Sequence, residues 1–180
     1  PSDMLALQNI SLSLIYLKNY EETVVYCDKV LEIKPSDTYA LKNKIFALEN
    51  LKKYDDVLKL CEKLITENPA EPILYNFAGV SCQALKDFKN SIIFLQKATE
   101  LDSKNISYLN NLANSYTTIR NYEDAEKVYN KALSINNQNT VILNNFASFQ
   151  KRVSNYSKAI KLYEKLITIE NKPYILNELA

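Results

Sequence analysis

Several residue types on which enzymes commonly rely are missing or scarce in this sequence. The 180 residues contain no histidine, which removes the commonest general base and a common metal ligand. Acidic pairs such as Glu21 with Glu22 are typical of helix starts, where carboxylates offset the helix dipole. A single glycine, Gly79, cannot build a phosphate-binding loop. The sequence therefore predicts no catalytic residue, no cofactor and no metal site, and a protein that is not an enzyme.

Asparagine is the side chain whose spacing indicates a binding chemistry. A carboxamide both donates and accepts hydrogen bonds, so it can pair with the main chain of an extended peptide whatever that peptide's side chains are. The alternative is drift of surface positions toward asparagine in a sequence that holds 21 of them. The asparagine column, with members separated by 34 residues or a multiple of 34, consists of Asn9, Asn43, Asn111 and Asn145, and Phe77 stands in its remaining place.

The same 34-residue period shows which elements must position the column. Aromatic residues recur at Tyr20, Tyr54, Phe88, Tyr122 and Tyr156. Within each period the apolar residues twice follow the spacing of one helix face, with a short polar turn between the two runs. The first helices are expected near 5–17, 39–51, 73–85, 107–119 and 141–153, and the second helices near 21–33, 55–67, 89–101, 123–135 and 157–169. Every member of the asparagine column falls on a first helix.

The residues at fixed offsets within each period resemble the tetratricopeptide repeat. The fourth copy carries the pattern at Leu109, Leu112, Ala113, Tyr116, Ala125, Tyr129 and Ala132, whereas the second copy departs from it with Val57 at the place of Ala125. The resemblance implies an all-α fold, a right-handed α-solenoid of antiparallel helix pairs, in a single domain over residues 1–180. The repeats are expected at 4–37, 38–71, 72–105, 106–139 and 140–172, with a partial sixth repeat at 173–180.

Two packing features follow from the pattern. Gly79 shares a column with Ala113 and Ala147, and a glycine within a helix costs about 1 kcal/mol relative to alanine. We therefore expect the second helix to cross closely at Gly79. The turn aromatics are expected to wedge between one hairpin and the next, with Tyr122 buried in this way.

The asparagine column resembles the asparagine ladder in the tetratricopeptide superhelix of O-linked N-acetylglucosamine transferase, which has the local sequence Asn-Leu-Ala found here at Asn111–Ala113. By this resemblance the column faces the concave groove and plays no part in stacking, and Phe77 interrupts it. The candidate peptide-binding residues beside Asn9, Asn43, Asn111 and Asn145 are Asn76, Asn110, Asn144, Asn114, Tyr39, Phe46 and Phe77.

Charge and cysteine content bear on the classes of partner and on the cellular compartment. The balance of 22 basic and 21 acidic side chains gives no electrostatic reason to expect nucleic acid or a membrane. Cys27, Cys61 and Cys82 form no CxxC pair, which favours free thiols in a reducing compartment and a cytoplasmic protein.

These observations predict a protein-interaction scaffold whose groove binds an extended peptide or protein segment. The alternative is the substrate-recruiting region of a larger glycosyl- or sulfo-transferase. A further expectation is self-association through the C-terminal edge, where the unfinished hairpin at 173–180 would expose Leu176 and Leu179.

Overall fold

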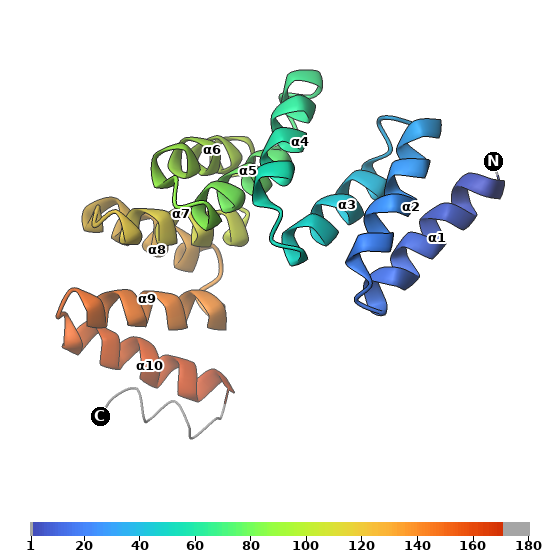
Figure 1. The fold of residues 1–180 in the computed structure, drawn as a ribbon. Helices are drawn as coiled ribbons and strands as arrows, with labels where there is room; N and C mark the ends of the chain where they lie inside the picture. The colour runs from blue at the N-terminus through green and yellow to red at the C-terminus, as the bar shows by residue number, and fades with distance from the viewer. Residues whose placement is uncertain (1, 171–180) are drawn as a thin grey trace.

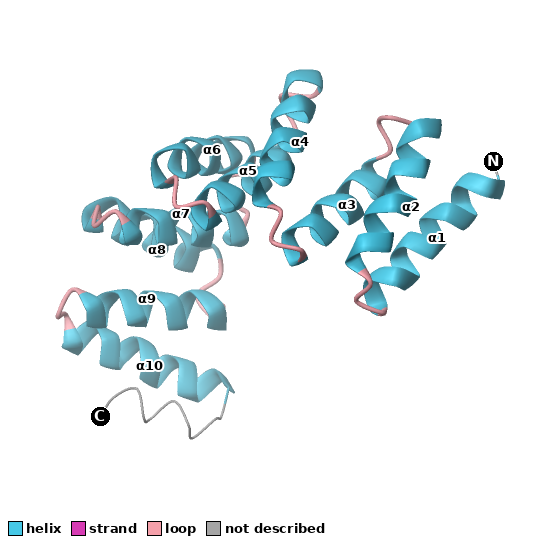
Figure 2. Cartoon of the chain, viewed as in Figure 1, coloured by secondary structure: helices cyan, strands magenta, loops and turns pink. Residues whose placement is uncertain are grey.

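The computed structural model describes residues 2–170, which form ten helices, a first and a second helix in each of five repeats (Figure 1). Helices and connecting loops account for all of this range, and no strand occurs within it (Figure 2). The first helices are α1 (Ser2–Tyr16), α3 (Thr38–Asn50), α5 (Pro72–Ala84), α7 (Ile106–Thr118) and α9 (Thr140–Arg152). The second helices are α2 (Tyr20–Ile33), α4 (Tyr54–Glu67), α6 (Phe88–Leu101), α8 (Tyr122–Ile135) and α10 (Tyr156–Glu170). The expected partial repeat at 173–180, with Leu176 and Leu179, lies outside the described residues.

Many of the asparagines end up at helix starts. Their side-chain oxygens accept hydrogen bonds from backbone N–H groups of the first helical turn, which have no partner within the helix. This local role accounts for part of the high asparagine content. The N-cap residues of this kind are Asn19, Asn105, Asn121, Asn139 and Asn155, which precede α2, α7, α8, α9 and α10.

The close crossing expected at Gly79 is confirmed. A Cβ atom added at Gly79 would lie 2.5 Å from Cγ of Leu95 and 3.2 Å from the backbone oxygen of Ser91, both on α6. Real Cβ atoms do not approach other atoms so closely, so α5 and α6 can pack at this distance only because no side chain is present.

The second hairpin packs differently because two of its small positions are filled. Ile45 of α3 stands where Gly79, Ala113 and Ala147 stand in the later repeats, and Val57 of α4 replaces a small residue of the second helix. Ile45 and Val57 are completely buried. As a result, α3 and α4 approach each other along much less of their length than the helices of the other four hairpins do (Figure 1).

The turn aromatics of the first and fourth hairpins reach the next hairpin as expected. The ring of Tyr20 lies edge-on to Phe46, with centroids 6.1 Å apart, and that of Tyr122 lies edge-on to Phe149 at 6.0 Å. Tyr122 is half-buried, however, and not buried as expected. Its ring covers the edge of the cluster around Tyr129 instead of entering it.

The three cysteines are free and buried, as small core residues. Burial raises the pKa of the Cys27 and Cys82 thiols to about 11 and that of Cys61 to about 12. The thiols therefore remain protonated at neutral pH and have little reactivity toward oxidants or electrophiles.

Candidate peptide-binding groove

The asparagine column forms bonds between successive first helices. Nδ2 of Asn111 donates to Oδ1 of Asn76 at 2.9 Å, and Nδ2 of Asn145 donates to Oδ1 of Asn110 at 2.8 Å. Each of these amide pairs joins residues 35 positions apart, so the same contact recurs at the α5–α7 junction and at the α7–α9 junction. The repeat places two amides side by side at each of these junctions, where a single row of amides was expected.

The two N-terminal members of the column behave differently. Nδ2 of Asn43 donates to Oγ of Ser11 at 3.3 Å, which links α3 to α1. Asn9 is exposed, and its side chain has no hydrogen-bond partner among residues 2–170. The expectation that the column plays no part in stacking is therefore wrong for Asn43, Asn111 and Asn145, because their amides bridge neighbouring helices.

Each amide pair still has polar atoms available for a ligand. The bond from Asn111 to Asn76 uses one N–H and one lone pair, which leaves the carbonyl oxygen of Asn111 and the amide nitrogen of Asn76 without a partner in the described part of the chain. The pair of Asn145 and Asn110 has the same two free groups. All four residues are half-buried and hence reachable from solvent. Each junction therefore presents one acceptor and one donor in a fixed relation.

Gln83 holds the Asn111–Asn76 pair in place through hydrogen bonds to α7. Its Nε2 atom donates to the backbone oxygen of Asn111 at 2.9 Å and to Oγ of Ser115 at 2.6 Å. The buried Ser115 hydroxyl lies 2.9 Å from that of Ser91. This network runs across α5, α6 and α7, so the position of the Asn111 backbone is fixed by three helices.

Cavities lie on both sides of the pair formed by Asn110 and Asn145. One, of about 230 Å³, lies between the N-terminal halves of α7 and α9; the other, of about 170 Å³, lies between their C-terminal halves. The first is lined by Ile106, Ser107, Asn110, Asn111, Asn139, Val141 and Ile142. The second is lined by Asn114, Thr117, Tyr129, Asn145, Ser148, Phe149 and Arg152. An occupant of the first cavity would contact Asn110, and an occupant of the second would contact Asn145.

Asn114 is held by the core beneath the second cavity. Its Oδ1 atom accepts a hydrogen bond from the Tyr129 hydroxyl at 2.7 Å. Burial raises the pKa of the Tyr129 phenol to about 12, so the hydroxyl remains a proton donor at neutral pH. The amide nitrogen of Asn114 has no partner among residues 2–170 and borders the cavity.

The remaining predicted residues are scattered. Tyr39 is 62% exposed, and Phe46 is 44% exposed and contacts Tyr20. Asn144 is exposed and lines neither cavity. Phe77 is half-buried and packs against the apolar cluster of α3, α4 and α5, so its ring is largely engaged in the core.

The sequence interpretation missed three parts of the site. Gln83 occupies a position without a recognisable pattern, because the atoms it bonds, on Asn111 and Ser115, lie on the next repeat. Arg152 was missed because it lines a cavity together with residues of the preceding repeat. The third is a cavity between α3, α4 and α5, whose signal was present in the sequence as the departures from small residues at Ile45 and Val57.

Within residues 2–170, no three acidic or cysteine side chains come together in a way that could hold a metal ion. No helix in that range is both long enough and apolar enough to span a membrane.

Three solved structures share the arrangement over nearly the whole chain, at sequence identities that show the fold alone. The MamA RS-1 ArsTM double mutant superposes with a TM-score of 0.81 and 16% identity, covering 95% of this chain and 96% of that one. TTC0263, a thermophilic tetratricopeptide protein of Thermus thermophilus, gives 0.78 and 16%, covering 97% and 95%. YrrB, a tetratricopeptide protein with an unusual peptide-binding site, gives 0.71 and 17%, covering 94% and 87%.

Comparisons of sequence place the chain more narrowly. No curated protein matches it. A family model, described as Psidin, N-terminal TPR repeats region, matches residues 12–139. The stacked helix pairs, the 34-residue period and this match agree on one assignment. The chain belongs to the Psidin N-terminal tetratricopeptide-repeat family, and its fold is a right-handed α-solenoid of these repeats.

Proposed function

We propose that this protein is an interaction scaffold that binds an extended peptide segment along the first-helix groove, and that it acts by binding and not by catalysis. The observation that carries the proposal is the pair of amide contacts at successive junctions, Asn111 with Asn76 and Asn145 with Asn110. Each presents a free carbonyl oxygen and a free amide nitrogen. Only an extended main chain offers unpaired N–H and C=O groups at regular intervals to match them.

The energies show what else the groove must supply. A hydrogen bond contributes about 1 kcal/mol net, so the amide pairs alone give only a few kcal/mol before the cost of ordering the peptide. Apolar contacts must add to this, at about 25 cal/mol for each Å² removed from water. Exposed apolar side chains on the first helices are available for this purpose at Leu5, Tyr39 and Val141, which are 58%, 62% and 59% exposed.

The comparisons support a scaffold and do not favour the transferase alternative. YrrB, whose structure is described as having a peptide-binding site, has the same fold. We also propose a reducing, cytoplasmic location, which the free and buried thiols of Cys27, Cys61 and Cys82 support.

The test removes one amide of each pair. Peptides selected from a displayed random 12-residue library on the unmodified protein serve as probes, and their affinities are then measured by fluorescence anisotropy. The double variant Asn111→Ala with Asn145→Ala should lose about 2–3 kcal/mol of binding free energy. It should also lose up to about 1 kcal/mol of folding stability for each bridging bond.

The matched control replaces two exposed asparagines that form no side-chain hydrogen bond in the described structure, Asn130 and Asn137. This double variant should bind the selected peptides as the unmodified protein does. Failure to select any peptide, or equal affinities for both double variants, would show that the groove does not recognise main chains through these amides.

A further inference from the structure

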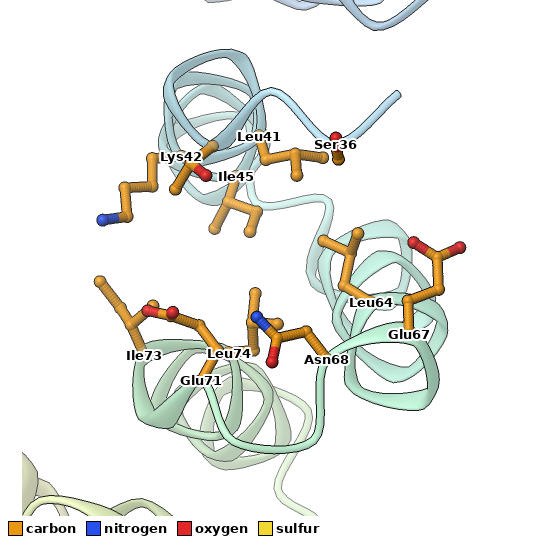
Figure 3. A pocket seen from close by; sticks show the side chains of 11 residues that line it. Ser36, Leu41, Lys42, Ile45, Leu64, Glu67, Asn68, Glu71, Ile73 and Leu74 are labelled. Atoms are coloured by element: carbon orange, nitrogen blue, oxygen red, sulfur yellow. The ribbon is translucent and has the colours of Figure 1, made fainter. Parts of the chain in front are cut away.

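The second hairpin contains a cavity of about 190 Å³ between α3, α4 and α5 (Figure 3). Its walls are apolar: Leu41 and Ile45 come from α3, Leu64 from α4, and Ile73 and Leu74 from α5. We call this cavity the α3–α5 slot. In Figure 3 these side chains converge on an open space, and Lys42 and Glu71 stand on opposite sides of the mouth between α3 and α5.

Departures from the repeat pattern create the slot. Ile45 and Val57 fill small-residue positions and hold α3 and α4 apart. The bridging amide is also absent between α3 and α5, because Phe77 occupies the place of Asn111 in the repeat, and Lys42 occupies the place of Asn76. The α3–α5 junction, which lacks a bridging amide, therefore opens into an apolar space.

A carboxylate at the mouth is not engaged by the protein. Glu71 is the N-cap residue of α5 but caps nothing with its side chain, whereas Asp37, Asn105 and Asn139 at the same repeat position all do. In Figure 3 the Glu71 carboxylate extends toward Ile73 at the mouth. Glu67 lines the same space, and neither glutamate has an ion-pair partner among residues 2–170. The apolar slot is thus bordered by two carboxylates, which lie on opposite sides of it in Figure 3, and by the ammonium of Lys42.

The slot repeats a position found further along the stack. Ile73, Lys42 and Glu71 of the slot correspond, two repeats later, to Val141, Asn110 and Asn139 of the cavity between α7 and α9. The two spaces therefore open between first helices in the same way. One is apolar with a charged rim, and the other is lined by Asn110 and Asn111, one member of each amide pair. A chain lying along the first helices would meet both.

We propose that the α3–α5 slot takes one side chain of leucine or phenylalanine size from the bound peptide, and that an adjacent lysine or arginine of that peptide pairs with Glu71. This proposal rests on the proposed function. The size is suitable, because a cavity of about 150 Å³ in another protein holds a benzene molecule. The rim carries the carboxylates of Glu71 and Glu67 against the single ammonium of Lys42, and this net negative charge favours a basic neighbour.

A dipeptide probe tests the slot without the amide pairs, because it is too short to reach from one junction to the next. N-acetyl-Leu-Arg-amide is titrated into the full chain, and the methyl signals of Leu41, Ile45, Leu64 and Ile73 are followed by NMR. These signals should shift, whereas that of Val141 should not. N-acetyl-Ala-Arg-amide should bind about 10- to 100-fold more weakly, because the apolar side chain supplies the burial. N-acetyl-Leu-Glu-amide should bind about three- to fivefold more weakly.

Two variants complete the test. Ile73→Trp fills the mouth and should abolish the shifts at Leu41 and Leu64, whereas the matched change Val141→Trp should leave them intact. Glu71→Gln should make the Leu-Arg and Leu-Glu probes bind more nearly equally, and its half-buried site on the slot rim should leave the fold unaffected. Thermal melting shows whether Ile73→Trp remains folded; if it does not, Glu71→Gln decides the outcome.

The outcomes separate the two proposals. Absence of methyl shifts at the slot, or shifts that are equal for leucine and alanine probes, would overturn the slot even if 12-residue peptides bind through the amides. Shifts at the slot combined with no effect of Asn111→Ala and Asn145→Ala would support the slot and remove the main-chain recognition instead.

Discussion

The fourth hairpin, α7 with α8, and the second hairpin, α3 with α4, are built on the same 34-residue pattern but are packed in different ways. In the fourth, Ala113 and Ala125 let the helices approach closely. In the second, Ile45 and Val57 stand at those places and the helices diverge. The comparison shows that a few side chains at the crossing point decide whether a repeat becomes continuous core or opens into a cavity.

The junctions between the first helix of each hairpin and the next first helix, α3–α5 and α7–α9, also differ. The α7–α9 junction is bridged by the amide pair of Asn145 and Asn110, and both helices start at an asparagine that caps them. The α3–α5 junction lacks such a pair, and α5 starts at Glu71, whose side chain does not cap it. Local capping, side-chain volume and hydrogen bonding thus change together along the stack.

The largest change in stability should come from placing isoleucine, the crossing residue of the second hairpin, at the crossing point of the third. Gly79→Ile places a branched side chain where even a Cβ atom would lie 2.5 Å from Leu95. We expect a loss of about 3 kcal/mol in unfolding free energy, because overpacking forces α5 away from α6. Urea denaturation measures it. Gly79→Ala, the smaller change, should cost less, and a neutral effect of both would show that α6 can move away without penalty.

The turn aromatics should show a smaller contrast between the two hairpins. Tyr122→Ala removes a half-buried ring that packs against Phe149, so we expect a loss of about 2 kcal/mol, below the range for fully buried aromatics. Tyr54→Ala is the matched change in the second hairpin, where the half-buried ring belongs to no core cluster, and it should cost less. Equal losses in urea denaturation would show that the two turns are packed equally well.

Restoring the side-chain cap of α5 should make the α3–α5 junction more like the α7–α9 junction. Glu71→Asn gives α5 the same N-cap residue as α7 and α9, and we expect a gain of about 1 kcal/mol in stability, measured by thermal melting. The reverse change, Asn139→Ala, should lose about the same amount. A destabilising Glu71→Asn would indicate that the glutamate stabilises the protein by another route.

The ion pair between Lys158 of α10 and Glu126 of α8 should make a small, pH-dependent contribution to folding stability. The hydrogen bond from the Lys158 ammonium lowers the pKa of the Glu126 carboxyl, and Lys158 also lies 4.7 Å from the ring centre of Phe146. The bond therefore contributes stability above the ordinary glutamate pKa and loses it as the pH falls through the lowered one. Melting temperatures between pH 7 and pH 3 should drop more for the unmodified protein than for Glu126→Gln. Parallel pH profiles would show that the pair contributes nothing.

The sequence by itself determined the helices and their order. Apolar residues spaced three and four apart select a helix through local geometry, and the 34-residue recurrence required that each pair share its core with the next. The helix ends agree with these expectations to within three residues. The capping asparagines could also have been assigned, because Asn105 and Asn139 lie two residues before the starts of predicted helices and act only on the turn that follows. Gly79 was predictable for the same reason, since one residue decides the approach of its own hairpin.

Only the tertiary structure decided how the asparagine column is used. Asn111 and Asn145 turn toward asparagines on the preceding first helix, 35 residues back, and this contact depends on the spacing of two helices that are not adjacent in sequence. The α3–α5 slot likewise needs the divergence of α3 and α4 and the missing amide between α3 and α5 at one place. Local periodicity reports which face of a helix is buried. Distances between helices result from side-chain volumes summed over several repeats, and no single window of sequence contains that sum.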